Sequence, residues 1–502
     1  MPRSNWKLFG LLLALAVLTR LDTYALSDIE FDEAVYFLMA RSMTQGHAPY
    51  TAIFDHKPPG IYGVYYVAIT LLGQSAFAVR VFATLAIAAS GWLAIKLYQR
   101  LRPDAQRFAW VPGVLVVLMF RKYGGQGANN ELFFVPAATG AILLLLTAVQ
   151  SQSGRVGRLL GAGALAGVAF WIKFNVVVEI QVAGALAVLV LADTTHPQRI
   201  RRMGEEVALT AIGFMAVAAL VIAPFALADM LETFRYATVE ANVRHVGHRM
   251  TPLETLAFLL TVLEASMAQW ALVIAGVVYH TRKDRESGPA RQYMFLCAWL
   301  LGAMASALAP GQPYDHYALE MAVPLCLAAW LAFEDVFLPH LQGRAAVAGL
   351  SFLIAGSTGT SLLAVPLNVG RELASLLKRR SLESIDTSRW VTNYINEHTR
   401  GDQVTLYVMD GQPLLYHLLG VDPPTRFAFP PFLLDPHFEN VTGAEAKPEV
   451  ARILADKPEW IVRRIDPFKE SLLMREHIGG LIADDYVLET TIHNLDLLHR
   501  VQ

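Results

Sequence analysis

The sequence predicts a mainly helical protein that crosses a membrane many times and ends in a small α/β domain. Of its 502 residues, 54% are hydrophobic and only 17% are charged, and the mean hydropathy is +0.40. Twelve apolar runs occupy the chain up to residue 366, whereas short helix-like and strand-like segments alternate from Asn368 onward. This composition is typical of an integral membrane protein that carries one water-exposed domain.

The distribution of basic residues predicts how the spans are oriented, because lysine and arginine in short loops favour the cytoplasm. Four loops between apolar runs are strongly basic. Their basic residues are Arg100, Arg102 and Arg107 in the first loop, Arg155 and Arg158 in the second, Arg199, Arg201 and Arg202 in the third, and Arg282, Lys283 and Arg285 in the fourth. They share one side only if the apolar run at 60–76 lies on the outer surface instead of crossing. About eleven transmembrane helices follow, with outer segments at 24–79, 121–131, 173–175, 229–252, 311–316 and beyond about 367.

The domain boundaries follow from the same pattern. Residues 1–367 form a transmembrane domain, with surface helices in the first outer loop, 24–79, and a second outer loop at 229–252. Residues 368–502 form an extracytoplasmic α/β domain of normal size. Its expected elements are a helix at 387–399, a strand at 404–409, a Pro-rich connection at 422–436, a helix at 448–456, and strands at 460–462 and 486–492.

The first outer loop is expected to begin with a surface helix. Ser27 and Glu30 have the spacing of a capping box, and Gly46 is a suitable residue to end the helix. Three apolar residues at helical spacing predict a face that rests on the membrane surface: Phe31, Val35 and Leu38.

The ionisable residues of this loop are the sharpest sign of chemistry. Asp32 and Tyr36 stand one helical turn apart, so they can act together. An interfacial carboxylate can act as a general base or bind a cation; its neighbour Glu33 is either part of the site or a surface charge. The following turn combines an acid, an imidazole and an ammonium ahead of two prolines: Asp55, His56, Lys57, Pro58 and Pro59. Lysine and protonated histidine suit a phosphate.

The outer loop at 234–250 is unusually basic for its predicted side of the membrane. Its cations include Arg244 and Arg249. They indicate either an anionic ligand such as a lipid phosphate or contact with anionic headgroups.

Three further outer sites leave two readings open. Asn130 and Glu131 begin a span, where a carboxylate also suits the helix dipole. Lys173, at a hairpin tip, either faces a site or snorkels to the surface. His316 and Tyr317 stand where a span re-enters the membrane, either as site residues or in an interfacial aromatic belt.

Composition also narrows the partners and cofactors. A net charge of −2 argues against a nucleic-acid partner, and both cysteines lie in apolar runs. No sequence motif for a zinc centre, a nucleotide phosphate or a dinucleotide is present. A divalent metal is the one cofactor left open, and membrane lipids are expected partners.

The order of these pieces resembles the GT-C fold of membrane glycosyltransferases, in the branch of the aminoarabinose transferases and protein O-mannosyltransferases. The resemblance rests on Asp32-Glu33-Ala34-Val35-Tyr36 and Asp55-His56-Lys57-Pro58-Pro59, then on Asn130-Glu131, the Gly163 to Lys173 segment and His316-Tyr317. It covers about three quarters of the chain. Val35 stands where some aminoarabinose transferases have arginine, and His56 where they have glutamate. Both differences bear on how a donor phosphate or a metal is held.

The resemblance implies transfer of a sugar from a polyprenyl-phosphate donor to a lipid, glycan or protein acceptor, usually with inversion. The site and the C-terminal domain would face the periplasm or cell exterior, across the bacterial inner membrane. Asp32 is the expected base and Asp55 the second candidate. Expected donor-binding residues are Lys57, His56, Tyr36, Arg244, Arg249, Lys173, His316 and Tyr317, with Glu33, Glu131 and Asn130 as further candidates.

The alternative is a multi-span transporter or lipid flippase. Transporters tend to show internal repeats and broken helices at the middle of the membrane. Here the charges gather on one face and the two halves of the chain do not match, which favours the enzyme.

Overall fold

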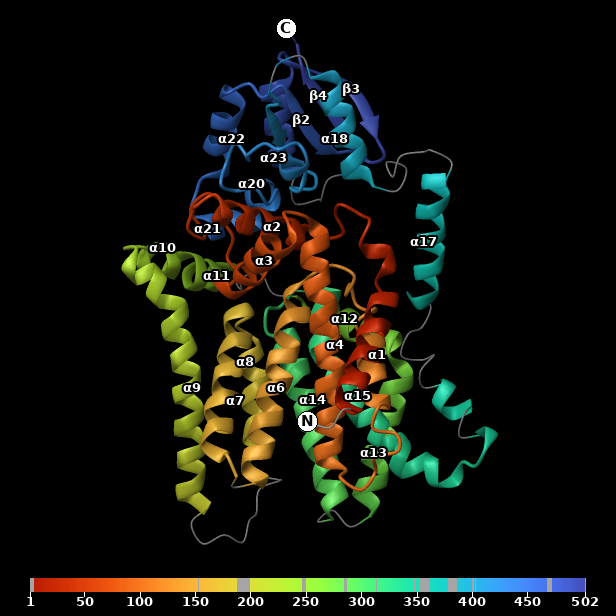
Figure 1. Cartoon of the computed structure of the whole chain (residues 1–502). Helices are drawn as coiled ribbons and strands as arrows, with labels where there is room; N and C mark the ends of the chain where they lie inside the picture. Colours follow the sequence, from red (N-terminus) through yellow and green to blue (C-terminus); the bar gives the residue numbers. More distant parts are fainter. Residues whose placement is uncertain are drawn as a thin grey trace. The chain divides into compact units, whose positions relative to one another are not determined.

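The computed structural model describes most of the chain: residues 4–151, 153–186, 199–245, 250–283, 287–312, 314–345, 348–352, 361–377, 386–399, 401, 403–466 and 472–501. Over these residues the protein is mainly helical and holds one four-stranded sheet (Figure 1). The chain divides into two units, each assembled from three stretches. Unit 1 comprises 1–21, 81–224 and 249–366, and unit 2 comprises 22–80, 225–248 and 367–502.

Unit 1 holds the long apolar helices. They are α1 (Ser4–Leu18), most of α4 (Ala76–Leu101), α5 (Val111–Met119), α6 (Asn130–Gln150), α7 (Arg155–Ile172), α8 (Val176–Leu186), α9 (Arg199–Leu227), α12 (Pro252–Ala265), α13 (Met267–Arg282), α14 (Gly288–Leu308), η4 (Asp315–Met321) and α15 (Ala322–Ala332). Helix α15 continues into a π-helical turn, Phe333–Phe337.

The described residues contain five helices that are long and apolar enough to cross a membrane, or six if α12 and α13 count as one span bent by 91°. The predicted count of about eleven spans is therefore unconfirmed. Helix α3 (Pro59–Leu72) has 14 residues and is about 21 Å long, shorter than the roughly 30 Å hydrocarbon core. Helices α1 and α8 are similarly short, so the expectation that the run at 60–76 does not cross stays a prediction.

Small residues allow close packing between α7 and α9. A Cβ atom on Gly163 would lie 1.9 Å from the carbonyl oxygen of Thr210, and one on Gly213 would lie 2.0 Å from that of Leu160. The backbones of the two helices are therefore in direct contact. Small residues at helix interfaces in membranes allow this close approach.

Unit 2 combines α2 (Phe31–Thr44), α3, part of α17 (Ser361–Leu377) and the C-terminal segment. The C-terminal helices are α18 (Thr387–His398), α19 (Leu415–Leu418), α20 (Pro431–Leu434), α21 (Pro436–Thr442), α22 (Ala446–Ala455) and α23 (Leu472–Ile482). The strands are β1 (Leu406–Val408), β2 (Trp460–Arg464), β3 (Tyr486–Ile492) and β4 (Leu495–Arg500).

The sheet has the order β1-β2-β4-β3, with β1 parallel to β2 and the other pairs antiparallel. The expected α18, β1, α22, β2 and β3 are all present. Strand β4 was not predicted. It pairs with β3 through a tight turn in which His493 takes a positive φ of 52°.

The prediction of a capping box at Ser27 is wrong. Helix α2 begins at Phe31, with Glu30 at the N-cap and no side-chain cap. The Ser27 hydroxyl instead donates to Asp386 Oδ1 at 2.5 Å, and its amide donates to Asp386 Oδ2 at 2.7 Å. A partner far along the chain has therefore replaced the local cap.

The apolar side of α2 is covered by protein, not by a membrane surface. Val35 and Leu38 are 3% and 2% exposed, and the Phe31 ring lies 6.3 Å from that of Phe429. The expected second outer loop is also largely helical, with α10 (Leu231–Arg235), a π-helical turn (Tyr236–Glu240) and α11 (Ala241–His245).

Candidate active site

Asp32 is held by a tyrosine from its own helix. The Tyr36 hydroxyl donates to Asp32 Oδ2 at 3.0 Å, as the one-turn spacing predicted. Tyr36 is 1% exposed, and its ring packs edge-on against Tyr62 and Tyr65 of α3 at 5.9 and 5.6 Å. Two helices therefore fix the donor of this hydrogen bond.

Asp55 is a buried carboxylate whose two oxygens are both occupied. The His56 amide donates to Oδ1 at 2.7 Å and the Tyr62 hydroxyl donates to Oδ2 at 2.9 Å. Burial alone would raise the pKa of Asp55, but the hydrogen bond and charge of His56, together with the Lys57 ammonium, outweigh it and hold the pKa below its ordinary value. Asp55 is therefore an ionised anchor for the turn.

The turn that carries His56 and Lys57 is fixed through its backbone. The Tyr50 hydroxyl donates to the Lys57 carbonyl at 2.9 Å, and the Asn242 amide donates to the His56 carbonyl. Pro58 then caps α3 and Pro59 opens it, as the fixed φ of proline allows. The backbone that carries the His56 and Lys57 side chains is thus held in place.

His245, one of the basic residues expected in the outer loop 234–250, and several aromatic residues complete this cluster. The His245 ring lies 4.7 Å from that of His56 and stacks on Phe438 at 5.1 Å. The Phe54 amide donates to the Arg426 carbonyl at 2.8 Å, and Phe54 packs on Phe432. The segment at 422–436, expected to be only an irregular connection, therefore packs against the Asp55–Lys57 turn. Its three phenylalanines were the feature of the sequence that could have indicated this packing.

The two arginines of the basic segment differ in what can be described. Arg244 reaches the Asn440 carbonyl at 3.1 Å and Glu240 at 3.8 Å, with 44% of its side chain exposed. It is partly committed yet open to solvent. Arg249 lies outside the described residues.

Glu33 is buried, not the surface charge that was one expectation. It accepts from Arg80 Nε at 2.7 Å, and the Arg80 side chain is fully buried. The same guanidinium donates to the Thr23 carbonyl at 2.6 Å. Glu33 therefore ties α2 to the start of the first outer loop.

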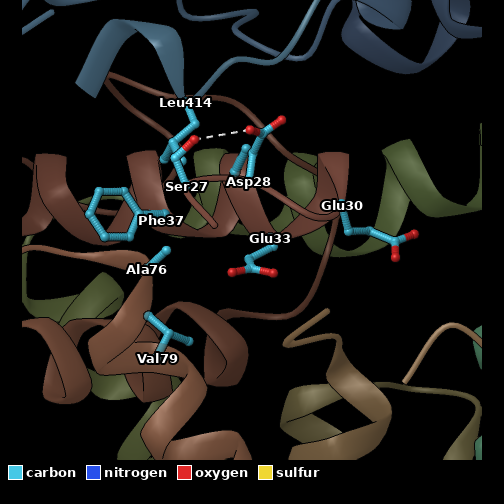
Figure 2. A pocket seen from close by; sticks show the side chains of 9 residues that line it. Ser27, Asp28, Glu30, Glu33, Phe37, Ala76, Val79 and Leu414 are labelled. Atoms are coloured by element: carbon cyan, nitrogen blue, oxygen red, sulfur yellow. Dashed lines mark hydrogen bonds between the residues drawn. The ribbon is translucent and has the colours of Figure 1, made fainter. Parts of the chain in front are cut away.

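A small pocket at the start of α2 has room for about one water molecule. Figure 2 shows Ser27 and Asp28 on one side of it, hydrogen-bonded at 3.1 Å, and Glu33 on another. Burial raises the pKa of Asp28, and its hydrogen bonds from Ser388 and Ser27 only partly offset this.

Asp32, by contrast, makes no ion pair with any residue that the structure describes, so it is the acid of α2 least committed to structure.

Unit 1 holds a second polar cluster around Lys173. Its ammonium contacts Glu131 and lies 3.1 Å from Glu320 Oε1. The side chains of Glu131 and Glu320 are 1% and 0% exposed. Lys173 therefore lies between two buried carboxylates, of which the sequence analysis had singled out only Glu131.

Other groups close this cluster on both sides. Lys173 lies 3.6 Å from the centroid of the Tyr317 ring, whose neighbour His316 is 4.9 Å away, ring to ring. The Asn175 amide donates to Glu320 Oε1 at 2.8 Å and to the Ser306 carbonyl at 2.7 Å. Asn130, at the start of α6, is 4% exposed, and its side-chain oxygen has no hydrogen-bond partner in the described structure.

The expected residues thus fall into two groups. Asp32, Tyr36, Asp55, His56, Lys57, Arg244 and Glu33 lie in unit 2, and Asn130, Glu131, Lys173, His316 and Tyr317 lie in unit 1. Within the described ranges, no three His, Cys, Asp or Glu side chains gather in a way that could hold a metal ion.

Comparison with known proteins gives one family match and a fold. The sequence model of the dolichyl-phosphate-mannose-protein mannosyltransferase family matches residues 56–226, about a third of the chain. The whole chain is similar in structure to ArnT from Cupriavidus metallidurans bound to undecaprenyl phosphate, with a TM-score of 0.65, 14% identity, and coverage of 99% of this chain and 98% of that one. For the same protein in its apo state the TM-score is 0.61 and the identity is 14%. The match covers 100% of this chain and 99% of that one. No curated protein sequence matches the chain.

These findings confirm the resemblance drawn from the sequence. The mannosyltransferase match begins at His56, inside the Asp55–Pro59 turn, and the structural match extends over nearly all of both chains. Both come from membrane-protein families, in agreement with the apolar helices of unit 1. The chain is an integral membrane protein with the GT-C fold of ArnT.

Proposed function

We propose that this protein transfers a sugar from a polyprenyl-phosphate donor to a hydroxyl of a lipid, glycan or protein acceptor, with inversion. The observation that carries the proposal is the Tyr36–Asp32 pair, a positioned carboxylate with no ion pair among described residues, in the unit that also presents His56 and Lys57. The fold of a protein solved with undecaprenyl phosphate and the mannosyltransferase match support the donor class.

Asp32 is the proposed general base. The acceptor oxygen attacks the anomeric carbon and its proton passes to Asp32, while the bond from that carbon to the phosphate oxygen breaks. A carboxylate in this position typically contributes ~10²–10⁴-fold to the rate. Asp55 stays the second candidate, but its oxygens already accept from Tyr62 and His56, so it is less available to take a proton.

The leaving polyprenyl phosphate needs positive charge where its own charge develops. Lys57 and His56 would supply it, together with Arg244 or Arg249. The fixed backbone of the 55–59 turn supports this role, because a cation on a rigid turn stabilises charge without first having to be ordered.

The polar cluster of unit 1 is also proposed to take part in donor binding. Lys173, His316 and Tyr317 are proposed to contact the donor, with Glu131 and Asn130 as supporting residues; Glu33 is a further candidate in unit 2. Because the Lys173 ammonium already lies between two carboxylates, any donor contact there would be made through the His316 and Tyr317 side.

The proposed placement follows the charge bias of the loops. About eleven spans would hold residues 1–367 in a bacterial inner membrane, and residues 368–502 with the catalytic residues would face the periplasm or cell exterior. Reporter fusions after Gly370 should read outside, and fusions near Lys283 should read inside.

The function is tested with purified protein in nanodiscs, incubated with a panel of polyprenyl-phosphate sugars and with lipids, glycans and proteins of the cell envelope as acceptors. Mass spectrometry should detect release of the sugar-free lipid phosphate with at least one donor. Asp32→Asn keeps the oxygen that accepts from Tyr36 and removes the base, so turnover should fall ~10²–10⁴-fold while donor binding changes little.

Glu232→Gln is the matched control, because Glu232 is an exposed carboxylate of unit 2 that pairs with its neighbour Arg235. It should retain full turnover. Wild-type turnover in Asp32→Asn would refute the assignment of the base, and failure of every donor with wild-type protein would refute the donor class.

A further inference from the structure

A groove in unit 1 has no part in the proposed reaction. It has a volume of about 410 Å³ and opens to the protein surface. Its α4 side is formed chiefly by Trp92, Lys96 and Arg100, and its α6 side by Leu143 and Leu144.

The spacing of the lining residues makes each wall a continuous helix face. On α4 they recur at intervals of four residues, so they stack on one side of the helix. On α6, Leu143 and Leu144 adjoin Thr147, one turn further on. Both helices are long and apolar enough to cross a membrane, and Figure 1 shows where α4 and α6 lie in the chain.

The α4 wall carries two positively charged side chains, Lys96 and Arg100. Lys96 Nζ lies 5.3 Å from the centroid of the Trp92 ring and 3.3 Å from the amide oxygen of Gln99. The buried Nε of Arg100 makes no hydrogen bond within the described structure. No described residue lining the groove is acidic. An anion would therefore meet two cations there and no competing carboxylate.

We propose that this groove binds an anionic phospholipid of the surrounding bilayer. Its phosphate would lie between Lys96 and Arg100, and an acyl chain would lie along Leu143, Leu144 and the Trp92 ring. Paired cations at the end of an apolar interhelical surface are the arrangement that recognises anionic headgroups.

The position along α6 separates this groove from the candidate site residues of unit 1. Leu143 and Thr147 lie 12 and 16 residues after Glu131, or about 18 to 24 Å along a helix axis. That distance approaches the thickness of the hydrocarbon core. On the proposed topology the groove lies at the cytoplasmic leaflet, so a bulk phospholipid, not the sugar donor, is the occupant.

Snorkelling alone does not account for the groove. A lysine near the end of a span can bend its ammonium toward water, which would explain Lys96. It does not explain a buried Arg100 nitrogen without a partner, nor the open apolar surface facing it on α6.

The test is native mass spectrometry of purified protein released from nanodiscs that contain phosphatidylglycerol or phosphatidylcholine. Wild-type protein should retain phosphatidylglycerol in preference, by about fivefold for each cation, or about 25-fold together. Lys96→Gln with Arg100→Gln should lose that preference.

Two further variants separate a built site from general surface charge. Arg282→Gln with Lys283→Gln removes two exposed cations at the end of α13 and should leave the preference intact. Leu143→Trp fills the apolar wall while keeping both cations, so it should weaken lipid retention without changing net charge.

Three outcomes would overturn the proposal. One is equal retention of the two phospholipids by wild-type protein. Another is an equal loss in the α4 and α13 variants. The third is displacement of phosphatidylglycerol by polyprenyl phosphate at equal concentration, which would assign the groove to the donor lipid. A folded, monodisperse Leu143→Trp protein that keeps full retention would remove the acyl-chain contact.

Discussion

Replacing Lys173 with methionine tests whether the cluster in unit 1 is a closed ionic unit. Methionine keeps a similar length and removes the charge. It would leave Glu131 and Glu320 facing each other without the ammonium between them, and both side chains are at most 1% exposed. Neither carboxylate can turn to water from such a position.

The expected loss is set by burial. Removing one partner of a buried ion pair typically destabilises a protein by about 3–5 kcal/mol, because the other charge stays uncompensated. Lys173 is the shared partner of two carboxylates, so the loss should lie at the upper end of that range. It should appear as a lower midpoint of thermal unfolding in detergent, followed by tryptophan fluorescence and by the fraction that stays monodisperse after heating.

A charge-balanced variant separates stability from chemistry. Adding Glu131→Gln and Glu320→Gln to Lys173→Met removes all three charges, and the new amide at 320 can still accept from Asn175. This protein should recover most of the lost stability, since uncharged replacements of buried ion pairs are often nearly neutral. If it folds but does not transfer sugar, the cluster contributes to the reaction beyond holding the fold.

Lys283→Met is the matched control, since Lys283 is an exposed lysine of the same unit, and it should unfold as wild type does. If Lys173→Met unfolds at the wild-type temperature, the cluster is not closed. The ammonium would then reach water, and simple snorkelling would explain Lys173.

Two further predictions concern packing and pH. Gly163→Ala should lower the stability of unit 1 by about 1–3 kcal/mol, because its methyl group would meet the Thr210 carbonyl, whereas Gly157→Ala, with open space around it, should be neutral or stabilising; equal midpoints of thermal unfolding for the two variants would contradict the packing. Asp55→Asn should destabilise the protein at pH 7, and the difference from wild type should shrink as pH falls below about 4, because the native pKa lies below the unfolded one and the carboxylate protonates there. Asp28→Asn should change stability with the opposite sign, because the pKa of Asp28 is raised. This variant should be as stable as wild type or more stable at pH 7, and any advantage should fade toward pH 4. Parallel pH profiles of stability for the two variants would refute the assignment of opposite pKa shifts.

The features predicted from the sequence are those that depend on neighbouring residues. The Asp32–Tyr36 pair needs only helical spacing, and Pro59 opens α3 because of its own backbone. The strands from β1 to β3 were visible as β-branched and aromatic runs after Asn368. Strand β4 was missed because its alternation is weak and its turn is formed by His493 and Asn494, not by a glycine.

The missed features depend on residues that meet only in the folded chain. Ser27 had the spacing of a local cap, yet Asp386 occupies its hydroxyl and amide. Glu33 could be read either as a site residue or as a surface charge, and its buried contact with Arg80 was not expected. A one-dimensional pattern gives the preferences of a side chain, but a distant charged partner contributes more than a local hydrogen bond when both are buried.

Glu320 is the omission that physical reasoning alone could have prevented. An acid inside an apolar run must find a partner in the protein, because a lone charge in lipid is very costly. Between His316 and Glu334 the chain contains one acid, Glu320. The hairpin at 172–176 contains one lysine, Lys173, which can pair with this acid. The same rule singles out Glu179, which the structure pairs with the Trp299 indole at 2.7 Å. In these two runs the isolated acid contacts another run, and such a pairing restricts helix arrangement more tightly than apolar residues do, because apolar residues pack against many neighbours equally well.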